Sequence, residues 1–523
     1  MNTSALPALL AGVLLMASTL FGAQRAHADP IFIADLDIVS FDGTEIDANL
    51  FVPDTPAPAG GYPTVLFTNS WVLDKHQYLL QAKALAENGY LVMSYSTRGF
   101  GASGGTVDVT GPATIADGKV LIDWLEANYP VGKLGAAGIS YGAGTSLVLA
   151  AQDPRIDAVA ALSGWSDIVE GLYPNETVNL VWGSLLTLTA FNLDTSVDVI
   201  WSNLRSGTDI DSVYNFAAPR SALSYVDNLN ANGTAVLMSN NFADYLFKPN
   251  SMTQLYSLLD GPKKLLLNPG THAVGETLGG NEGHIWATSF RWFDHYLKGD
   301  ANGIDSEPKV DMAVRISNKI EQFDDFPVTD KRTRYYLHPR LSYFNNASMK
   351  TGTYNGWGWN NDFHGGADTK AGTGIPVISD ALEGFGIPVY TDMNGINGYH
   401  AIEYNSPVHW STFKIRGTPT LEMWIKPSKP EVQLQVHLYD TNPLGWGRLI
   451  THAPITLHDA AVGQAQKISL ELFTTSYDVP PGHVVTLAID TEGLIYQKPR
   501  DTWYEIEVPY RSNRQSVLTI PHL

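Results

Sequence analysis

Cysteine is absent from the 523 residues. Disulfides, thiolate catalysis and cysteine-ligated zinc or iron–sulfur sites are therefore excluded. The sequence also lacks an H-E-x-x-H metal motif and a phosphate-binding loop with its Lys-Ser/Thr pair. We therefore expect neither a metal nor any other cofactor.

Basic residues are scarce relative to acidic ones. The chain has 33 Lys and Arg against 53 Asp and Glu, a formal net charge of −20. Such a charge repels phosphates, which argues against a nucleic-acid partner. Because 44% of the residues are hydrophobic and 16% are charged, a globular core is expected, and the length suggests more than one domain.

Long hydrophobic runs are lacking after the N-terminal region. Residues 6–21 are almost wholly apolar, and Ala26-His27-Ala28 supplies the small-x-small pattern of a cleavage site. This pattern predicts a signal peptide over residues 1–28 and therefore a secreted or periplasmic protein with no membrane span after cleavage. The alternative is an uncleaved anchor, but the run is short for a membrane-spanning helix.

Strand-like and helix-like segments alternate over residues 29–302. The expected strands are residues 63–68, 90–95, 134–139, 156–162, 235–239 and 265–268. This alternation predicts an α/β domain with a mostly parallel sheet covered by helices on both faces.

The alternation breaks between residues 164 and 229, where the chain is rich in apolar and aromatic residues. We expect helices inserted above the sheet as a cap over the site, because long insertions in compact domains tend to be functional. The alternative is an extra packing layer without contact to substrate. Residues 303–523 show short alternating runs between Gly, Pro, Asn and Asp clusters, which predicts an all-β jelly-roll domain.

Gly138-Ile139-Ser140-Tyr141-Gly142 matches the G-x-S-x-G elbow, in which a strand turns sharply into a helix at the nucleophile. Ser103 lies in a second match. Only Ser140 follows an apolar strand and precedes a helix of small residues, so we assign Ser140 as the nucleophile and predict the α/β-hydrolase fold.

A serine nucleophile needs a histidine base and an acid that orients the base. In this fold the chain order is Ser, acid, His, which is met by Asp244 and His272, each just beyond an expected strand. His284 and His295 are rivals for the base, but both lie in or near a helix-like stretch.

Two donors are needed for the oxyanion. We expect the backbone N–H of Tyr141 to be one, and Trp71 to supply the other through its backbone or its indole. A tryptophan that only packs in the core is the alternative for Trp71. Trp165, Trp182 and Phe242 are the aromatic residues expected to contact substrate.

Several motifs resemble the family of X-prolyl dipeptidyl peptidases, cocaine esterase and α-amino-acid ester hydrolases. Residues 98–105 resemble its R-G-x-G-x-S-x-G loop, and Asp117 to Trp124 with the Ser140 elbow resemble its D-G…W…G-x-S-Y-G block. Its acid and base motifs resemble Phe242-Ala243-Asp244 and Pro269-Gly270-Thr271-His272. The most specific match is residues 291–299, which are similar to its R-W-F-D-H-W-L-K-G helix. The resemblance implies a serine hydrolase with a C-terminal jelly roll.

The sequence departs from this family at two positions. Trp71 stands where the family's esterases often have an oxyanion tyrosine, and Phe242 replaces the tryptophan of the acid motif. The family's X-prolyl peptidases commonly carry an added N-terminal helical domain, whereas the first strand here is expected soon after Asp29. With the apolar run at 180–191, this favours a small-molecule carboxylic ester over an X-Pro peptide or amide. A non-catalytic binding protein on this scaffold is the alternative from another class.

Overall fold

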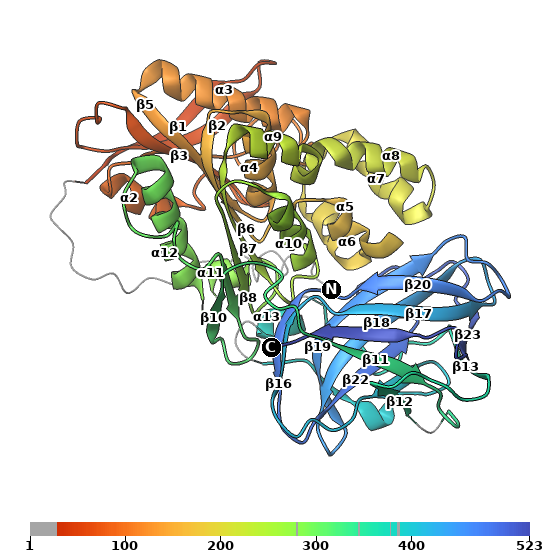
Figure 1. Cartoon of the computed structure of the whole chain (residues 1–523). Coiled ribbons are helices and arrows are strands. Elements are labelled where there is room, and N and C mark those ends of the chain that lie inside the picture. The colour runs from red at the N-terminus through yellow and green to blue at the C-terminus, as the bar shows by residue number, and fades with distance from the viewer. Residues whose placement is uncertain (1–28, 279–280, 344–345, 377, 384–386) are drawn as a thin grey trace.

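The computed structural model describes residues 29–278, 281–343, 346–376, 378–383 and 387–523 (Figure 1). The predicted signal peptide, residues 1–28, lies outside these ranges, and its cleavage stays a prediction. Within the described part of the chain, no helix combines the length and apolar character needed to cross a membrane.

The first sheet has ten strands in the order β1-β2-β4-β3-β5-β6-β7-β8-β9-β10. It runs parallel from β4 through β9, and β1, β2 and β10 pair antiparallel at its two edges. The strands are β1 Ile31–Val39, β2 Glu45–Val52, β3 Tyr62–Thr68, β4 Leu91–Tyr95, β5 Val131–Ile139, β6 Ile156–Leu162, β7 Ala235–Asn241, β8 Lys263–Asn268, β9 Val310–Ala313 and β10 Ile320–Phe323. The predicted α/β-hydrolase fold is confirmed.

Helices cover both faces of this sheet, so its central strands are buried on both sides. One face packs against α3 Pro112–Asn128, α4 Tyr141–Gln152, α9 Val226–Asn232 and α10 Pro249–Leu258. The other packs against α2 Leu79–Glu87 and α12 Glu282–Phe293. Two-sided burial explains why strands such as β3 read as continuous apolar runs rather than alternating ones.

The sheet continues past residue 302, where the sequence predicted the domain to end. Strand β9 pairs parallel with β8, and β10 returns antiparallel to β9. Val310 and Met312 face the same buried cluster as the preceding strands. The short strands β9 and β10 carry too little periodicity to be assigned to either domain from sequence.

Four α-helices lie between β6 and α9 and form the cap (yellow, Figure 1). They are α5 Val169–Leu172, α6 Leu180–Thr189, α7 Thr195–Ser206 and α8 Ile210–Ala217. Asp194 accepts a hydrogen bond from Ser196 N at the start of α7, and Gly207 ends this helix with a φ of +62°. Two backbone hydrogen bonds between Val107 and the 192–194 segment join the cap to the catalytic domain.

The C-terminal part is all-β, as predicted. A twelve-stranded sheet and a two-stranded sheet account for it, and nearly all pairs are antiparallel. The strands are β11 Arg332–His338, β12 Ala347–Lys350, β13 Trp359–His364, β14 Tyr390–Asp392, β15 Ile402–Asn405, β16 Phe413–Gly417, β17 Thr420–Pro427, β18 Val432–Thr441, β19 Trp446–Leu457, β20 Gln466–Glu471, β21 Thr475–Val479, β22 Val484–Asp490, β23 Glu505–Tyr510 and β24 Val517–Pro521, with helix α13 Ile378–Glu383 between β13 and β14.

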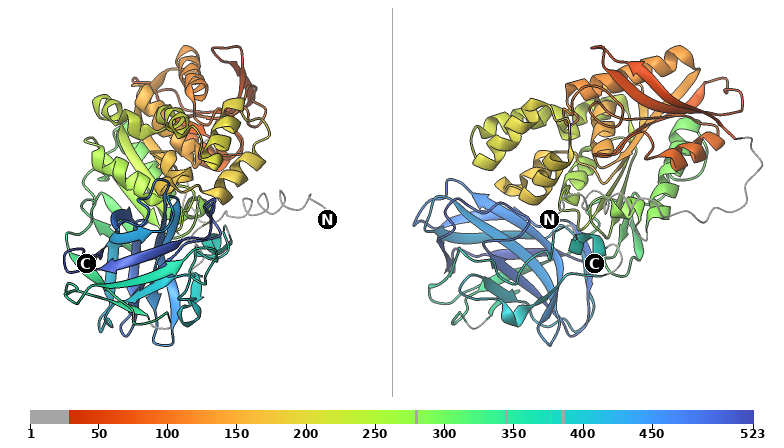
Figure 2. Two further views of the ribbon diagram at one scale, coloured as in Figure 1. Left: turned by 90° about the vertical axis from the view of Figure 1, so that its right-hand side faces the viewer. Right: turned by 180° about the vertical axis from the view of Figure 1, so that it is seen from behind.

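The β domain packs against the cap and the edge of the first sheet (Figure 2). Val181 N donates to Ile495 O at 3.1 Å, and Gln497 N donates to Val178 O at 2.9 Å. Asn250 of α10 exchanges hydrogen bonds with the backbone of Leu472 and Thr474. The cap is therefore held from two sides.

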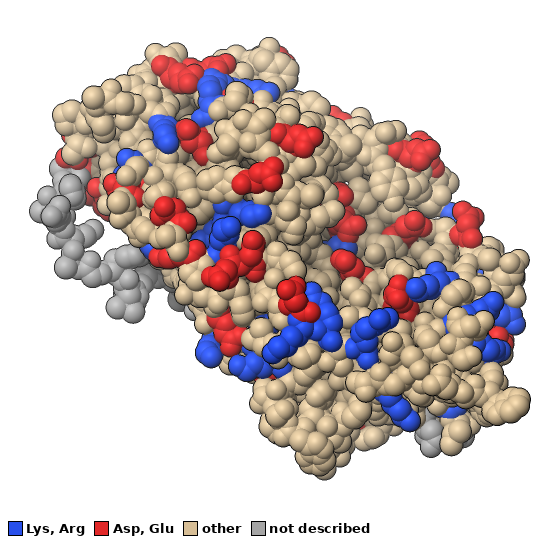
Figure 3. All heavy atoms as spheres, in the orientation of Figure 1, with Lys and Arg blue, Asp and Glu red and all other residues tan. Residues whose placement is uncertain are grey.

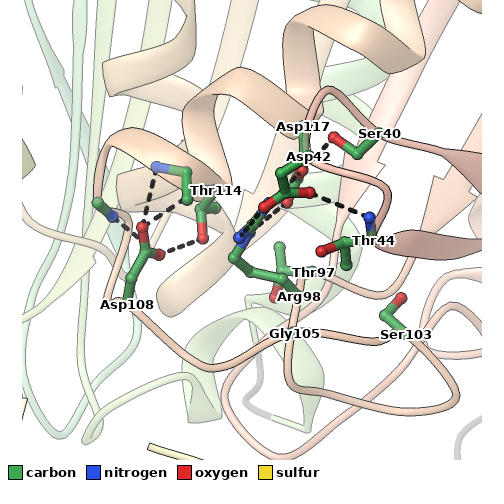
Figure 4. A network of polar contacts seen from close by, with 12 residues as sticks. Ser40, Asp42, Thr44, Thr97, Arg98, Ser103, Gly105, Asp108, Thr114 and Asp117 are labelled. Carbon is green, nitrogen blue, oxygen red and sulfur yellow. Dashed lines mark hydrogen bonds and ion pairs between the residues drawn. The ribbon is translucent and has the colours of Figure 1, made fainter. Parts of the chain in front are cut away.

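The loop over residues 98–105 is anchored by a buried ion pair (Figure 4). Arg98 donates to both carboxylate oxygens of Asp117 at 2.7 Å, and Asp42 and Ser40 complete the network. Burial raises the pKa of Asp117 although Arg98 opposes that shift. This loop is followed by Val107, whose backbone forms the two hydrogen bonds to the cap described above.

We expect Arg98→Ala to lower the free energy of unfolding by about 3–5 kcal/mol, because it leaves the Asp117 carboxylate buried and unpaired. Urea unfolding followed by fluorescence measures this. The control is Lys467→Ala, which breaks an exposed pair with Glu422 and should cost less than about 1 kcal/mol. Equal losses in the two variants would contradict the role of the buried pair.

Candidate active site

Ser140 occupies a strained turn between β5 and α4. Its φ is +59°, in the left-handed region that non-glycine residues rarely adopt. A Cβ on Gly138 would lie 2.6 Å from the Gly142 backbone, and one on Gly142 would lie 2.1 Å from Thr68 O. Only glycine fits at these positions, so the two flanking glycines are what allows the elbow to form.

The structure brings Ser140, His272 and Asp244 together in a continuous chain of hydrogen bonds. Ser140 Oγ lies 2.7 Å from His272 Nε2, and His272 Nδ1 lies 2.8 Å from Asp244 Oδ2. The three residues follow β5, β8 and β7, whose carboxyl ends meet at one edge of the sheet.

The acid and the imidazole are each held by further contacts. Asp244 is fully buried, and its Oδ1 accepts hydrogen bonds from the backbone N–H groups of Leu246 and Phe247. The ring of His272 meets Trp182 and Phe247 edge to face, with ring centroids 5.7 and 5.2 Å away. These contacts fix the orientation of the imidazole toward Ser140.

The rival residues have other partners. His284 Nε2 lies 2.8 Å from Asp311, and the ring of His295 contacts Asp300 O at the surface. Ser103 Oγ donates to Ser96 O and accepts from Asp47 N, so its hydroxyl joins two backbone segments.

The contacts of Trp71 show which of its two N–H groups could donate to an oxyanion. Its indole N–H points to Leu186 O and Thr189 Oγ1, both at 3.2 Å, so this group ties the loop after β3 to α6. The indole N–H is therefore engaged by α6 and does not serve as the oxyanion donor. The backbone N–H of Trp71 remains the predicted second donor. The N–H of Tyr141 is at the first residue of α4, where no intrahelical acceptor exists.

The three aromatic residues expected at the substrate differ in position. Trp165 lines the pocket beside Ser140, with its indole N–H bonded to Arg220 O at 2.8 Å. Trp182 contacts the imidazole, as described above. Phe242 lies instead in the core, on the sheet face that α3, α4, α9 and α10 cover. Val236 and Met238 of β7 point to the same face, and residue 242 continues their alternation.

Glu276 was missed by sequence reasoning. It is fully buried and accepts hydrogen bonds from Ser163, Ser239 and Asn241. Burial raises the pKa of this carboxyl. Ser163 Oγ in turn accepts from Ala273 N, so the cluster supports the segment that carries the imidazole. A single glutamate without a motif gave no signal of this burial.

An apolar pocket opens at Ser140 between the catalytic domain and the cap. It holds about 900 Å³ of empty space when the part open to solvent is included. Among the described residues, no Asp, Glu, Lys, Arg or His lines it. The pocket is therefore suited to uncharged groups.

No group of three or more His, Asp or Glu side chains that could hold a metal occurs within the described ranges. On the face seen in Figure 3, acidic and basic side chains are interspersed, and no continuous basic track is visible there.

Residues 42–198 match the model of the X-Pro dipeptidyl-peptidase (S15 family), and residues 302–508 match that of the X-Pro dipeptidyl-peptidase C-terminal non-catalytic domain. A protein of Bacillus cereus, provisionally named Xaa-Pro dipeptidyl-peptidase, is 26% identical over 48% of this chain and 47% of its own length. One of Rhodopirellula baltica with the same provisional name is 22% identical over 77% of this chain and 65% of its own. The aligned part thus spans about half the length of the Bacillus relative.

Solved structures extend the similarity to the whole fold. An α-amino acid ester hydrolase superposes with a TM-score of 0.74 at 15% identity, covering 97% of this chain and 98% of its own. A CocE/NonD family hydrolase from Staphylococcus aureus gives 0.72 at 13% identity, covering 95% and 94%. The chain thus carries the S15 domain and the C-terminal non-catalytic domain of the X-Pro dipeptidyl-peptidase family, and the superpositions show that it shares the α/β-hydrolase fold of these solved structures.

Proposed function

We propose that the protein is an exported serine hydrolase that cleaves carboxylic esters through an acyl-enzyme. The observation that carries this proposal is the hydrogen-bonded chain from Ser140 through His272 to Asp244. A binding protein on the same scaffold, the alternative from another class, has no use for all three groups in this arrangement. Export rests on the pattern of the first 28 residues.

The proposed reaction has two steps. Ser140 Oγ attacks the carbonyl carbon while its proton passes to His272 Nε2, which forms a tetrahedral oxyanion. The bond from this carbon to the alkoxy oxygen then breaks, and the departing oxygen takes the proton from His272. Water attacks the acyl-enzyme with the same proton transfers and releases the acid. Asp244 holds the imidazole tautomer and stabilises its cationic form.

Two backbone N–H groups are proposed to stabilise the oxyanion. Tyr141 offers its N–H at the start of α4, where the helix dipole also favours negative charge. Trp71 lines the pocket next to Ser140, and its indole is engaged by α6, which leaves its backbone for this role. The phenol oxygen of Tyr141 accepts a hydrogen bond from Thr110 N, which fixes this side chain to the loop before α3.

The second candidate is an X-Pro dipeptidyl peptidase, which the names of the matched family and of the relatives suggest. Such an enzyme binds a free N-terminal ammonium, and a desolvated cation needs carboxylates nearby. The described pocket wall has none. Glu170, an acidic residue next to the pocket-lining Val169, is already paired with Lys248. An uncharged ester therefore fits the pocket better.

We expect Ser140→Ala to lower kcat by roughly 10⁴ to 10⁶ with p-nitrophenyl acetate, because it removes the nucleophile. Circular dichroism should show that the variant stays folded. The matched control is Ser103→Ala, whose hydroxyl bonds only to backbone groups and which should keep kcat within about tenfold of wild type. Near-normal turnover by Ser140→Ala would refute the assignment.

Trp71→Phe should change kcat by less than about threefold, because it removes an indole N–H that bonds to α6 rather than to the substrate. Steady-state kinetics with a soluble ester measures this. A loss on the order of 10² or more would show that the indole serves the oxyanion after all.

Ester preference is tested by comparing p-nitrophenyl butyrate with Ala-Pro-p-nitroanilide. After correction for the greater intrinsic reactivity of the ester, we expect kcat/KM to favour the ester, because none of the described residues that line the pocket is a carboxylate that could pair with the ammonium group. Efficient anilide cleavage that disappears on acetylation of the peptide would instead support the dipeptidyl peptidase.

A further inference from the structure

The pocket does not stop at the nucleophile but continues into the cap. Its wall begins at Ser140 and Trp71 and reaches Leu204 of α7 and Val213 of α8. These two residues belong to a buried apolar cluster inside the cap, with Tyr173 beyond α5. The space therefore has one reactive end and an apolar interior within the cap.

Four polar side chains along this wall already have protein partners. The indole N–H groups of Trp71 and Trp165 bond to backbone carbonyls, and the hydroxyl of Thr187 bonds within α6. The phenol of Tyr173 lies 3.1 Å from His458. A ligand in the interior thus meets surfaces that offer dispersion contacts and burial from water rather than hydrogen bonds.

Trp201 of α7 forms a wall with two sides. One side lines the pocket, and the other lines a shallow outer hollow together with Asp198, Ser202 and Arg205. Its ring rests directly on Gly183 of α6, since a Cβ built there would lie 2.2 Å from Cη2 and 2.4 Å from Cζ3. Glycine at 183 is thus what lets the indole occupy this position and separate the interior from the surface.

We propose that the cap interior is an acyl-chain site and that Trp201, seated on Gly183, is the end wall that limits the length of the chain. This proposal rests on the proposed ester hydrolysis. The substrates it selects are esters of aliphatic carboxylic acids whose hydrocarbon chain extends from Ser140 into the cap. Selectivity by length follows because each methylene kept inside is removed from water, whereas one that meets the indole has no space.

The experiment measures kcat/KM for p-nitrophenyl esters from acetate to decanoate, below their solubility limits. In the wild-type protein kcat/KM should rise about fourfold for each added methylene until the chain reaches Trp201, and then fall. Trp201→Ala, or Trp201→Phe if the first variant folds poorly, should move this maximum to longer chains. Gly183→Ala should push the indole into the pocket and move the maximum to shorter ones.

In each variant the profile is read relative to that variant's own kcat/KM for the acetate ester, so that a change common to all esters cancels. Phe191→Ala is the control, since this aromatic side chain of the cap is 98% exposed and does not line the pocket. A flat chain-length profile, or an unmoved maximum in folded variants at both 201 and 183, overturns the acyl-chain site while ester hydrolysis stands. Absence of ester hydrolysis in the wild-type protein overturns the proposed function itself.

Discussion

The close approach of α4 to the end of β3 is the constraint on which the site depends. The α carbon of Gly142 lies so near Thr68 O that no side chain fits, and Gly138 meets the same helix from the other side. This contact forces Ser140 into a left-handed conformation at the tip of β5. The strain costs on the order of 1–3 kcal/mol and is sustained by the fully buried sheet on both sides of the turn.

The parallel sheet brings Ser140 together with the other two residues of the hydrogen-bonded chain. Strands β5, β6, β7 and β8 are adjacent, so residues that follow them meet although the chain separates them by more than a hundred positions. Asp244 and His272 come from two of these strands. Ser163, which follows β6, donates to the buried Glu276 and accepts a hydrogen bond from the backbone N–H of Ala273, next to His272. One sheet edge thus supplies both the reactive groups and their support.

The cap and the β domain shape the pocket at the carboxyl ends of these strands. The helices of the cap enclose a pocket whose lining, among the described residues, has no charged side chain, and Trp71 ties α6 to the loop beside the nucleophile. Hydrogen bonds from the β domain to Val178, Val181 and Asn250 hold the other side of the cap and α10. Ser140, His272 and Asp244 all belong to the first domain, and the C-terminal domain supports the walls of the pocket next to them.

The sequence by itself determined the features that depend on local patterns. Alternating strand and helix periods predicted the α/β domain and the all-β domain. The apolar strand before Ser140 and the small-residue helix after it distinguished this serine from Ser103, which lies in a second match to the same glycine pattern. Chain order after two strands pointed to Asp244 and His272.

Tertiary structure alone decided features that depend on neighbours distant in the chain. The indole of Trp71 turned to α6, Phe242 followed the parity of β7 into the core, and β9 and β10 joined the first sheet. Glu276 became buried, and Trp201 came to line the pocket while resting on Gly183. The physical reason is that periodicity fixes which face a residue occupies within its own element, whereas hydrogen-bond partners and cavity walls are set by packing between elements.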